Sequence, residues 1–239
     1  MQLYIFQKGF NYAQDGPGNR LVYHLQGCNF SCPWCANPES MPLSGGIATD
    51  VDALLDEADR CRPLFTDGGG VTFTGGEPTL QYEALRCALQ GLRAARIDTA
   101  IETNASHPRL PELSGLVDHL IIDLKITDPV RHKRHLGAQN DTVLRNIRRA
   151  SEEHADVCIR IPLVRGYNAS RGDMEAAASF LAGCGGAVRC ELLRYHEYGL
   201  DKWKRLGLPY AVHDGFVTDE QVNDAARILE SNGIAVVTS

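Results

Sequence analysis

Three cysteines stand close together after an apolar run near the start of the chain. Cys28, Cys32 and Cys35 have the spacing C-x3-C-x2-C, and the preceding run Leu21–Leu25 is typical of a buried strand. Three thiolates at this spacing can bind three irons of an iron–sulfur cube and leave the fourth iron without a protein ligand. An open metal position indicates a site for chemistry, because side chains fill every position of a purely structural centre.

Two other kinds of metal site use similar residues. A structural zinc would need a fourth ligand, for which His24 is near in sequence but falls in the middle of the expected strand. A ferredoxin-type electron carrier would need a fourth cysteine at short range, and the next one is Cys61. The spacing favours the open iron–sulfur site, and both alternatives stay open at this point.

Length and charge narrow the class of protein. A chain of 239 residues with 44% hydrophobic residues can bury a substantial core as one domain. A net charge of −6 gives no electrostatic reason to bind nucleic acid or an anionic membrane. Met1–Phe10 lacks the apolar stretch of a signal peptide, and no run reaches the roughly 18 apolar residues of a membrane helix. We therefore expect a cytoplasmic enzyme.

Eight cysteines in a cytoplasmic chain are expected to be ligands and core thiols, not disulfides. Outside the three-cysteine loop, we expect small core thiols at Cys61, Cys87, Cys158, Cys184 and Cys190. Cys184 and Cys190, spaced C-x5-C, are the one pair with the spacing of an extra metal or redox site. We predict a single cluster.

Apolar, β-branched runs alternate with helical patterns along the chain. Strands are expected at Leu21–Leu25, Val71–Thr74, Thr99–Thr103, Leu120–Leu124, Val157–Val164 and Val188–Leu193. Six strand–helix units in a row predict an α/β fold, a partial (β/α)6 TIM-type barrel with parallel strands in a single domain. The domain prediction covers residues 1–239, with a short N-terminal segment (1–19) and a C-terminal helix and strand extension (216–239).

Two helix starts carry capping signals. Thr49 with Asp52 resembles a capping box that opens a helix over Val51–Arg60. Thr218 with Gln221 opens a second helix that is expected to run to about Ser231, before a last short strand.

Polar residues follow nearly every expected strand at the same end. They are the cysteine loop, Thr74-Gly75-Gly76-Glu77-Pro78, Glu102-Thr103-Asn104, Asp123-Leu124-Lys125, Arg160 and Tyr195-His196-Glu197. Barrel enzymes build their active sites at the carboxyl ends of parallel strands. The pattern therefore predicts one active site at the end that carries the cysteines.

The residue types indicate what this site would bind. Gly75 and Gly76 leave room for a ligand against the backbone, or form a plain tight turn, and Glu77 offers a carboxylate to an ammonium group. Lys125 and Arg160 can meet a carboxylate, or form salt bridges to the acidic strand ends. Together these groups predict a pocket for a cofactor that carries an amino acid.

These motifs resemble a known family. The cysteine loop with Gly75-Gly76-Glu77 is similar to the radical S-adenosylmethionine (SAM) superfamily. Further motifs are similar to those of the glycyl-radical-enzyme activating enzymes. Among these, the chain resembles the short form, of the pyruvate formate-lyase type, which lacks a ferredoxin-like insert. These motifs are Asp15-Gly16-Pro17-Gly18-Asn19-Arg20, Gln26-Gly27, Asn37-Pro38-Glu39-Ser40, Asp123-Leu124-Lys125 and Leu192-Leu193-Arg194-Tyr195-His196-Glu197.

The resemblance implies the cofactors and their residues. Cys28, Cys32 and Cys35 would bind one [4Fe-4S] cluster, and the amine and carboxylate of SAM would complete the fourth iron. SAM would be held by Trp34, Ala36, Gly75, Gly76, Glu77, Asp123, Leu124, Lys125, Arg160 and His196. No side chain would be the catalyst, because the radical is carried by a 5′-deoxyadenosyl group derived from SAM.

The resemblance also implies partners. A monovalent cation would lie at Glu102, Thr103 and Asp123, although Glu102-Thr103-Asn104-Ala105 departs from the family's usual run there. Asp15, Gly16, Pro17 and Gly18 would receive the glycine loop of a large glycyl radical enzyme at the barrel mouth. A flavodoxin or ferredoxin would supply electrons, and we expect a monomer.

Two alternatives stay open from the sequence. One is a radical SAM enzyme that acts directly on a small molecule, in the manner of 7-carboxy-7-deazaguanine synthase. The other is an iron–sulfur electron carrier or sensor, for which the polar strand ends would have no purpose.

Overall fold

The chain forms two compact units in the computed structural model, which describes residues 1–186 and 188–237. The first unit contains residues 1–29 and 40–121, and the second contains residues 30–39 and 122–237. The chain passes from the first unit to the second within strand β6 (His119–Asp123).

The first unit is built on strands in the order β3-β1-β2-β4-β5. These are β1 (Gln2–Tyr12), β2 (Asn19–Leu25), β3 (Ile47–Asp50), β4 (Val71–Gly75) and β5 (Thr99–Thr103). β2, β4 and β5 run parallel, whereas β1 is antiparallel to both β2 and β3. The helices are α1 (Val51–Cys61), α2 (Tyr82–Ala94) and α3 (Leu110–Ser114), with 3-10 turns at Arg62–Leu64 and Pro78–Gln81. Fully buried Val22, Tyr23 and Phe73 form part of the core.

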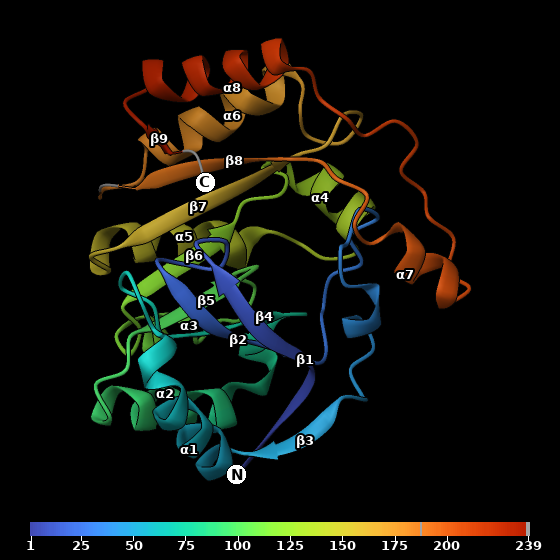
Figure 1. The fold of residues 1–239 in the computed structure, drawn as a ribbon. Coiled ribbons are helices and arrows are strands. Elements are labelled where there is room, and N and C mark those ends of the chain that lie inside the picture. Colours follow the sequence, from blue (N-terminus) through green and yellow to red (C-terminus); the bar gives the residue numbers. More distant parts are fainter. Residues whose placement is uncertain (187, 238–239) are drawn as a thin grey trace. The chain divides into compact units, whose positions relative to one another are not determined.

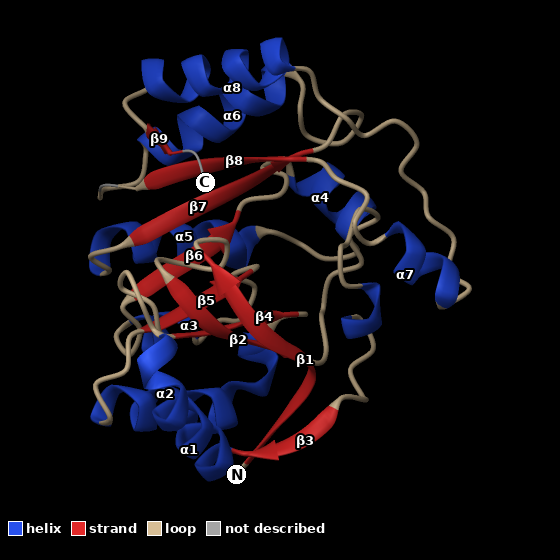
Figure 2. Cartoon of the chain, viewed as in Figure 1, coloured by secondary structure: helices blue, strands red, loops and turns tan. Residues whose placement is uncertain are grey.

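The second unit carries the parallel strands β7 (Val157–Leu163), β8 (Arg189–Arg194) and β9 (Ala235–Val237). Its helices are α4 (Pro129–Leu136), α5 (Asp141–Glu153), α6 (Arg171–Ala182), α7 (Leu200–Arg205) and α8 (Asp219–Ser231). Helices α6 and α8 lie side by side (Figure 1). The short helix α7 lies between two loops, one that connects it to β8 and a longer one that leads to α8 (Figure 2).

Parallel strands that alternate with helices confirm the predicted α/β class. Most of the expected strands are present within a residue or two of their expected bounds. The domain boundaries stay a prediction. Among the described residues, no helix is both long and apolar enough to cross a bilayer.

The two helix starts have different outcomes. The capping box at Thr218 is present, since its side chain accepts from Gln221 N and Gln221 caps it in return. The capping box at Thr49 was wrong, because Asp50 is the N-cap residue and Thr49 lies within β3. Thr49 fits the strand that precedes the helix, as β-branched residues often do.

Candidate active site

In the first unit, the loops that follow β2 and β4 are joined through their backbones. Gly76 N donates to Leu25 O at 2.9 Å, and Glu77 N donates to Gly27 O at 2.7 Å. A Cβ on Gly76 would lie 2.1 Å from Gly27 O, so no larger residue fits there. Gly75 has φ of +115°, and a Cβ on it would lie 2.4 Å from Leu25 N. These glycines therefore make room for the neighbouring backbone, and their contact with a cofactor stays a prediction.

The Glu77 carboxylate is hydrogen-bonded to Thr79 and to the residues at the end of β5. Its side chain is 0% exposed, and Oε1 accepts from Thr79 N at 3.0 Å, from Thr79 Oγ1 at 2.5 Å and from Thr103 Oγ1 at 2.6 Å. Oε2 accepts from Asn104 N at 2.7 Å. Burial raises the pKa of Glu77, and these hydrogen bonds oppose part of that rise. Both carboxylate oxygens are therefore engaged by neighbouring residues, and a contact of Glu77 with a cofactor stays a prediction.

The residues after β5 belong to the same network. Thr103 donates its hydroxyl hydrogen to Glu77 and accepts from Ala105 N at 3.0 Å. Glu102 Oε2 accepts from Thr74 Oγ1 at 3.0 Å. Glu102 and Thr103 belong to the first unit and Asp123 to the second, so the cation site formed by these three residues stays a prediction.

Asn104 was missing from the expected site residues. Its side-chain amide lies 4.0 Å from Cys28 Sγ and donates to Asn29 Oδ1 at 3.1 Å. Its place in the run Glu102-Thr103-Asn104 was the only sequence signal for this contact, because the two residues are 76 positions apart in the chain.

The remaining two cysteines of the motif lie in the second unit. Cys32 is 6% exposed, and Cys35 N donates to Cys32 O at 3.1 Å, which closes a tight turn. Asn37 N donates to Cys35 Sγ at 3.3 Å. Burial raises the pKa of the Cys35 thiol, and the hydrogen bond from Asn37 opposes that rise.

This donor chemistry fits an iron–sulfur cluster. Thiolate is the form that binds metal, and an amide hydrogen bond to sulfur stabilises it. Cys28 belongs to the first unit, so the full set of three ligands stays a prediction. All eight cysteines lie among the described residues, and none is joined in a disulfide there, which agrees with the expectation for this chain.

Two of the expected cationic residues form ion pairs in the second unit. Lys125 Nζ lies 2.5 Å from Asp123 Oδ2, which is one of the salt bridges considered for this lysine. Arg160 Nε lies 2.6 Å from Glu191 Oε2, and both side chains are buried. The pair joins facing positions of β7 and β8. Glu191 was not among the acids considered as the partner of Arg160.

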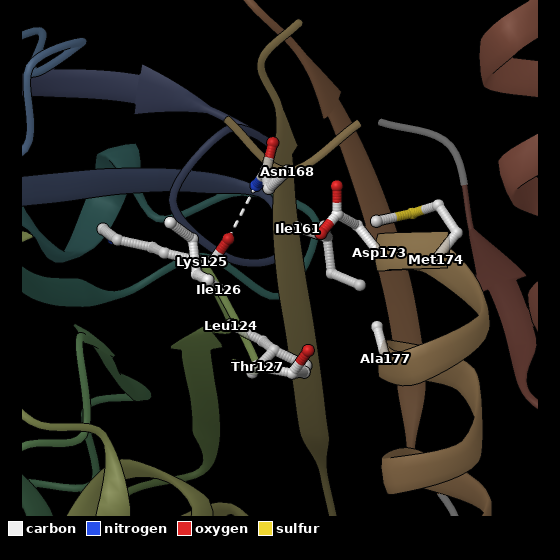
Figure 3. Close-up of a pocket in the computed structure, with 9 residues that line it drawn as sticks. All are labelled: Leu124, Lys125, Ile126, Thr127, Ile161, Asn168, Asp173, Met174 and Ala177. Carbon is white, nitrogen blue, oxygen red and sulfur yellow. Dashed lines mark hydrogen bonds between the residues drawn. The ribbon is translucent and has the colours of Figure 1, made fainter. Parts of the chain in front are cut away.

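A small pocket lies where the chain leaves β6 (Figure 3). It is lined by Leu124, Lys125, Ile126, Thr127, Ile161, Asn168, Asp173, Met174 and Ala177. Asn168 is 2% exposed and donates to Lys125 O at 2.7 Å and to Pro162 O at 2.6 Å. Leu124 N donates to Arg160 O at 2.8 Å. The backbone of the predicted SAM-binding run Asp123–Lys125 is thus fixed by hydrogen bonds.

Three other expected SAM residues lie in loops of the second unit. The Trp34 ring meets the Tyr167 ring edge-on, with centroids 5.1 Å apart, and Ala36 is half-buried. His196 stacks on Tyr198 with centroids 4.1 Å apart and accepts from Tyr198 N at 3.4 Å. Burial lowers the pKa of His196, so its neutral form is favoured.

The segment Asp15–Gly18 packs near the amino-terminal ends of β2 and β4. Thr72 Oγ1 donates to Asp15 O at 2.7 Å, and a Cβ on Gly18 would lie 2.2 Å from Thr66 O. Buried Arg20 donates to Pro17 O at 3.1 Å. These contacts are at the amino-terminal ends of β2 and β4, whereas the cysteine loop follows their carboxyl ends. The role of this segment in receiving the glycine loop of a partner enzyme stays a prediction.

Comparison with known proteins bears directly on these motifs. The model of the radical SAM superfamily matches residues 22–181, a stretch that contains the cysteine loop, Gly75–Glu77 and Asp123–Lys125. The chain belongs to the radical SAM superfamily.

Within this superfamily, the chain is similar to activating enzymes. It is 32% identical over 235 residues to the pyruvate formate-lyase-activating enzyme of Staphylococcus epidermidis, and the match covers 94% of each chain. The enzyme of the same name from Staphylococcus aureus strain USA300 is 32% identical over 222 residues, covering 89% of this chain and 88% of that one. The protein is therefore a radical SAM enzyme of the activating-enzyme family.

Solved structures of radical SAM enzymes share the fold. A domain of a pyruvate-formate lyase-activating enzyme from Bacteroides vulgatus is 31% identical, with a TM-score of 0.60, and the match covers 72% of this chain and 99% of that domain. A radical SAM methyltransferase from Sphaerobacter thermophilus, 18% identical, matches 96% of this chain and 68% of its own with a TM-score of 0.68. These likenesses confirm the predicted partial-barrel α/β fold.

Proposed function

We propose that this protein generates a glycyl radical on a partner enzyme. The observation that carries the proposal is the likeness to pyruvate formate-lyase-activating enzymes over nearly the whole of both chains. A small-molecule radical SAM enzyme stays the competing proposal.

Cys28, Cys32 and Cys35 would hold one [4Fe-4S] cluster, with SAM at the open iron. Once reduced by an external donor, the bound cluster would supply the one electron needed to split methionine from SAM, and the carbon radical so released would take a hydrogen atom from the glycine Cα. The protein's own contribution is positional. Glu77 holds the glycine turn after β4, and Asn168 holds the backbone at Lys125. Trp34 and Cys32 are buried, and their burial would limit the access of water to this part of the site.

The proposal includes the finer expectations for cofactors and partners. The partner would be a large enzyme with a C-terminal glycine loop, and electrons would come from a cytoplasmic flavodoxin or ferredoxin. A monovalent cation would lie at Glu102, Thr103 and Asp123. The protein would work as a monomer.

The experiment uses anaerobically reconstituted protein with SAM, reduced flavodoxin and pyruvate formate-lyase as the partner. We expect an electron resonance signal on a glycine of the lyase, and none with Cys32→Ala. The proposal fails if SAM is cleaved without a glycine signal on the lyase and cleavage rises only when a small metabolite is added. That outcome would favour the small-molecule enzyme.

A further inference from the structure

In the second unit, helix α7 and the glycine before it hold the part of the cysteine loop that contains Cys35. Trp203 Nε1 donates to Cys35 O at 2.9 Å. Lys202 Nζ donates to Asn37 Oδ1 at 2.7 Å and pairs with Glu39 Oε1 at 3.0 Å. These residues are more than 160 positions away from the loop in sequence.

The packing at Gly199 leaves no room for a side chain. A Cβ there would lie 2.4 Å from Cys35 O and 2.9 Å from Ala36 Cα. The backbone before α7 thus lies directly against the loop, which brings Lys202 and Trp203 within reach of it.

Burial, a ring contact and a hydrogen bond together hold the Trp203 side chain in place. It is 8% exposed, and its ring meets the Tyr210 ring edge-on with centroids 5.6 Å apart. An indole N–H can only donate, so a buried tryptophan needs an acceptor, which Cys35 O supplies. α7 has six residues, and a helix of this length is not stable by itself, so its position depends on contacts such as these.

The held segment is the one that donates a hydrogen bond to the cysteine sulfur. Asn37 N lies 3.3 Å from Cys35 Sγ. Trp203 fixes the carbonyl of Cys35 on one side of this contact, and Lys202 fixes the side chain of Asn37 on the other. Hydrogen bonds to the ligand sulfurs are among the factors that set the reduction potential of an iron–sulfur cluster.

We infer that Trp203 and Lys202 are positioning residues for Cys35. They hold the Asn37 amide on its sulfur, and through that contact they set how firmly a bound cluster is retained and how easily it is reduced. The effect on the cluster rests on the proposed function, whereas the effect on the position of the loop does not require a bound cluster.

The first test uses metal-free protein and hydrogen–deuterium exchange over residues 30–39. Trp203→Phe and Lys202→Met should each raise exchange in this segment about fivefold, as expected for the loss of one hydrogen bond. Lys202→Arg should restore slow exchange, because arginine can still donate to Asn37 Oδ1. The matched controls are Tyr210→Phe and Lys204→Met. Tyr210→Phe keeps the ring that packs on Trp203 and removes only the hydroxyl that pairs with Tyr195, and Lys204 is exposed beside Asp201 on the same helix.

The second test measures the midpoint potential of the reconstituted cluster. Trp203→Phe and Lys202→Met should give a more negative potential than the controls, because a weaker amide contact stabilises the added electron less. Unchanged exchange and unchanged potential in both variants would overturn the inference, whatever happens to activity. If Trp203→Phe fails to fold, Lys202→Met and its arginine rescue decide the matter. Failure to activate pyruvate formate-lyase would count against the proposed function and leave the exchange result standing.

Discussion

At the scale of single residues, Glu77 shows how a motif side chain can serve the backbone around it. Its carboxylate caps the turn Pro78–Gln81 and also accepts from the residues that end β5. Four hydrogen bonds converge on a side chain that is fully buried. Burying a carboxylate is costly unless it is hydrogen-bonded, and here Thr79, Thr103 and Asn104 supply the donors.

We expect Glu77→Gln to lower the free energy of unfolding by about 1–3 kcal/mol. An amide NH2 would face a backbone or hydroxyl donor and leave a buried group unsatisfied. Urea denaturation of the metal-free protein measures the change. Glu83→Gln is the control, since Glu83 is exposed on α2 and its loss should have little effect. A Glu77→Gln variant with unchanged stability and lost SAM binding would show instead that the carboxylate contacts the cofactor.

At the scale of elements, backbone hydrogen bonds join the loop after β2 to the loop after β4. Gly76 permits the join, because its position is filled by Gly27 O. We expect Gly76→Ala to lower the free energy of unfolding by about 1–3 kcal/mol through overpacking, and to reduce the iron retained after reconstitution. Thermal unfolding and iron counting measure the two effects. Gly172→Ala is the matched control, because nothing lies within 4 Å of its Cβ position in α6. Equal iron retention in Gly76→Ala and Gly172→Ala would contradict the claim that the contact between these two loops helps to retain the cluster.

Elements with a strong local signal were predictable from the sequence. The strand at Val157–Leu163 is a buried apolar run, and the helix after Thr218 carries its own capping box. The strand Gln2–Tyr12 was not foreseen. Only Leu3 and Ile5 of its residues are buried, so its alternation is weak, and it exists because it pairs with β2 and β3. Pairing between distant segments leaves little trace in a single sequence.

The site was predictable where a motif lies within one loop, and less so where the fold brings residues together. The spacing of the cysteines and the order Gly75-Gly76-Glu77 are local. The pairing of Arg160 with Glu191 depends on the register of β7 and β8, which the sequence does not reveal. The contact of Trp203 with the Cys35 loop likewise joins residues 168 positions apart.

At the scale of the whole molecule, the chain belongs to the radical SAM superfamily and is similar to activating enzymes along nearly its whole length. Residues 22–181 carry the superfamily match, and the likeness to activating enzymes covers 94% of the chain. An enzyme that modified a small molecule would need a pocket for that molecule. An activating enzyme must instead admit a glycine-bearing segment of another protein to the same cofactor.

The measurement that distinguishes an activating enzyme from a small-molecule enzyme most directly is the transfer of an isotope from the partner to the SAM-derived product. Pyruvate formate-lyase is prepared with glycine deuterated at Cα and mixed anaerobically with the reconstituted, reduced protein and SAM. We predict that deuterium from the lyase appears in the released 5′-deoxyadenosine as the glycyl radical forms. Release of 5′-deoxyadenosine without deuterium, and without a radical on the lyase, would contradict the account.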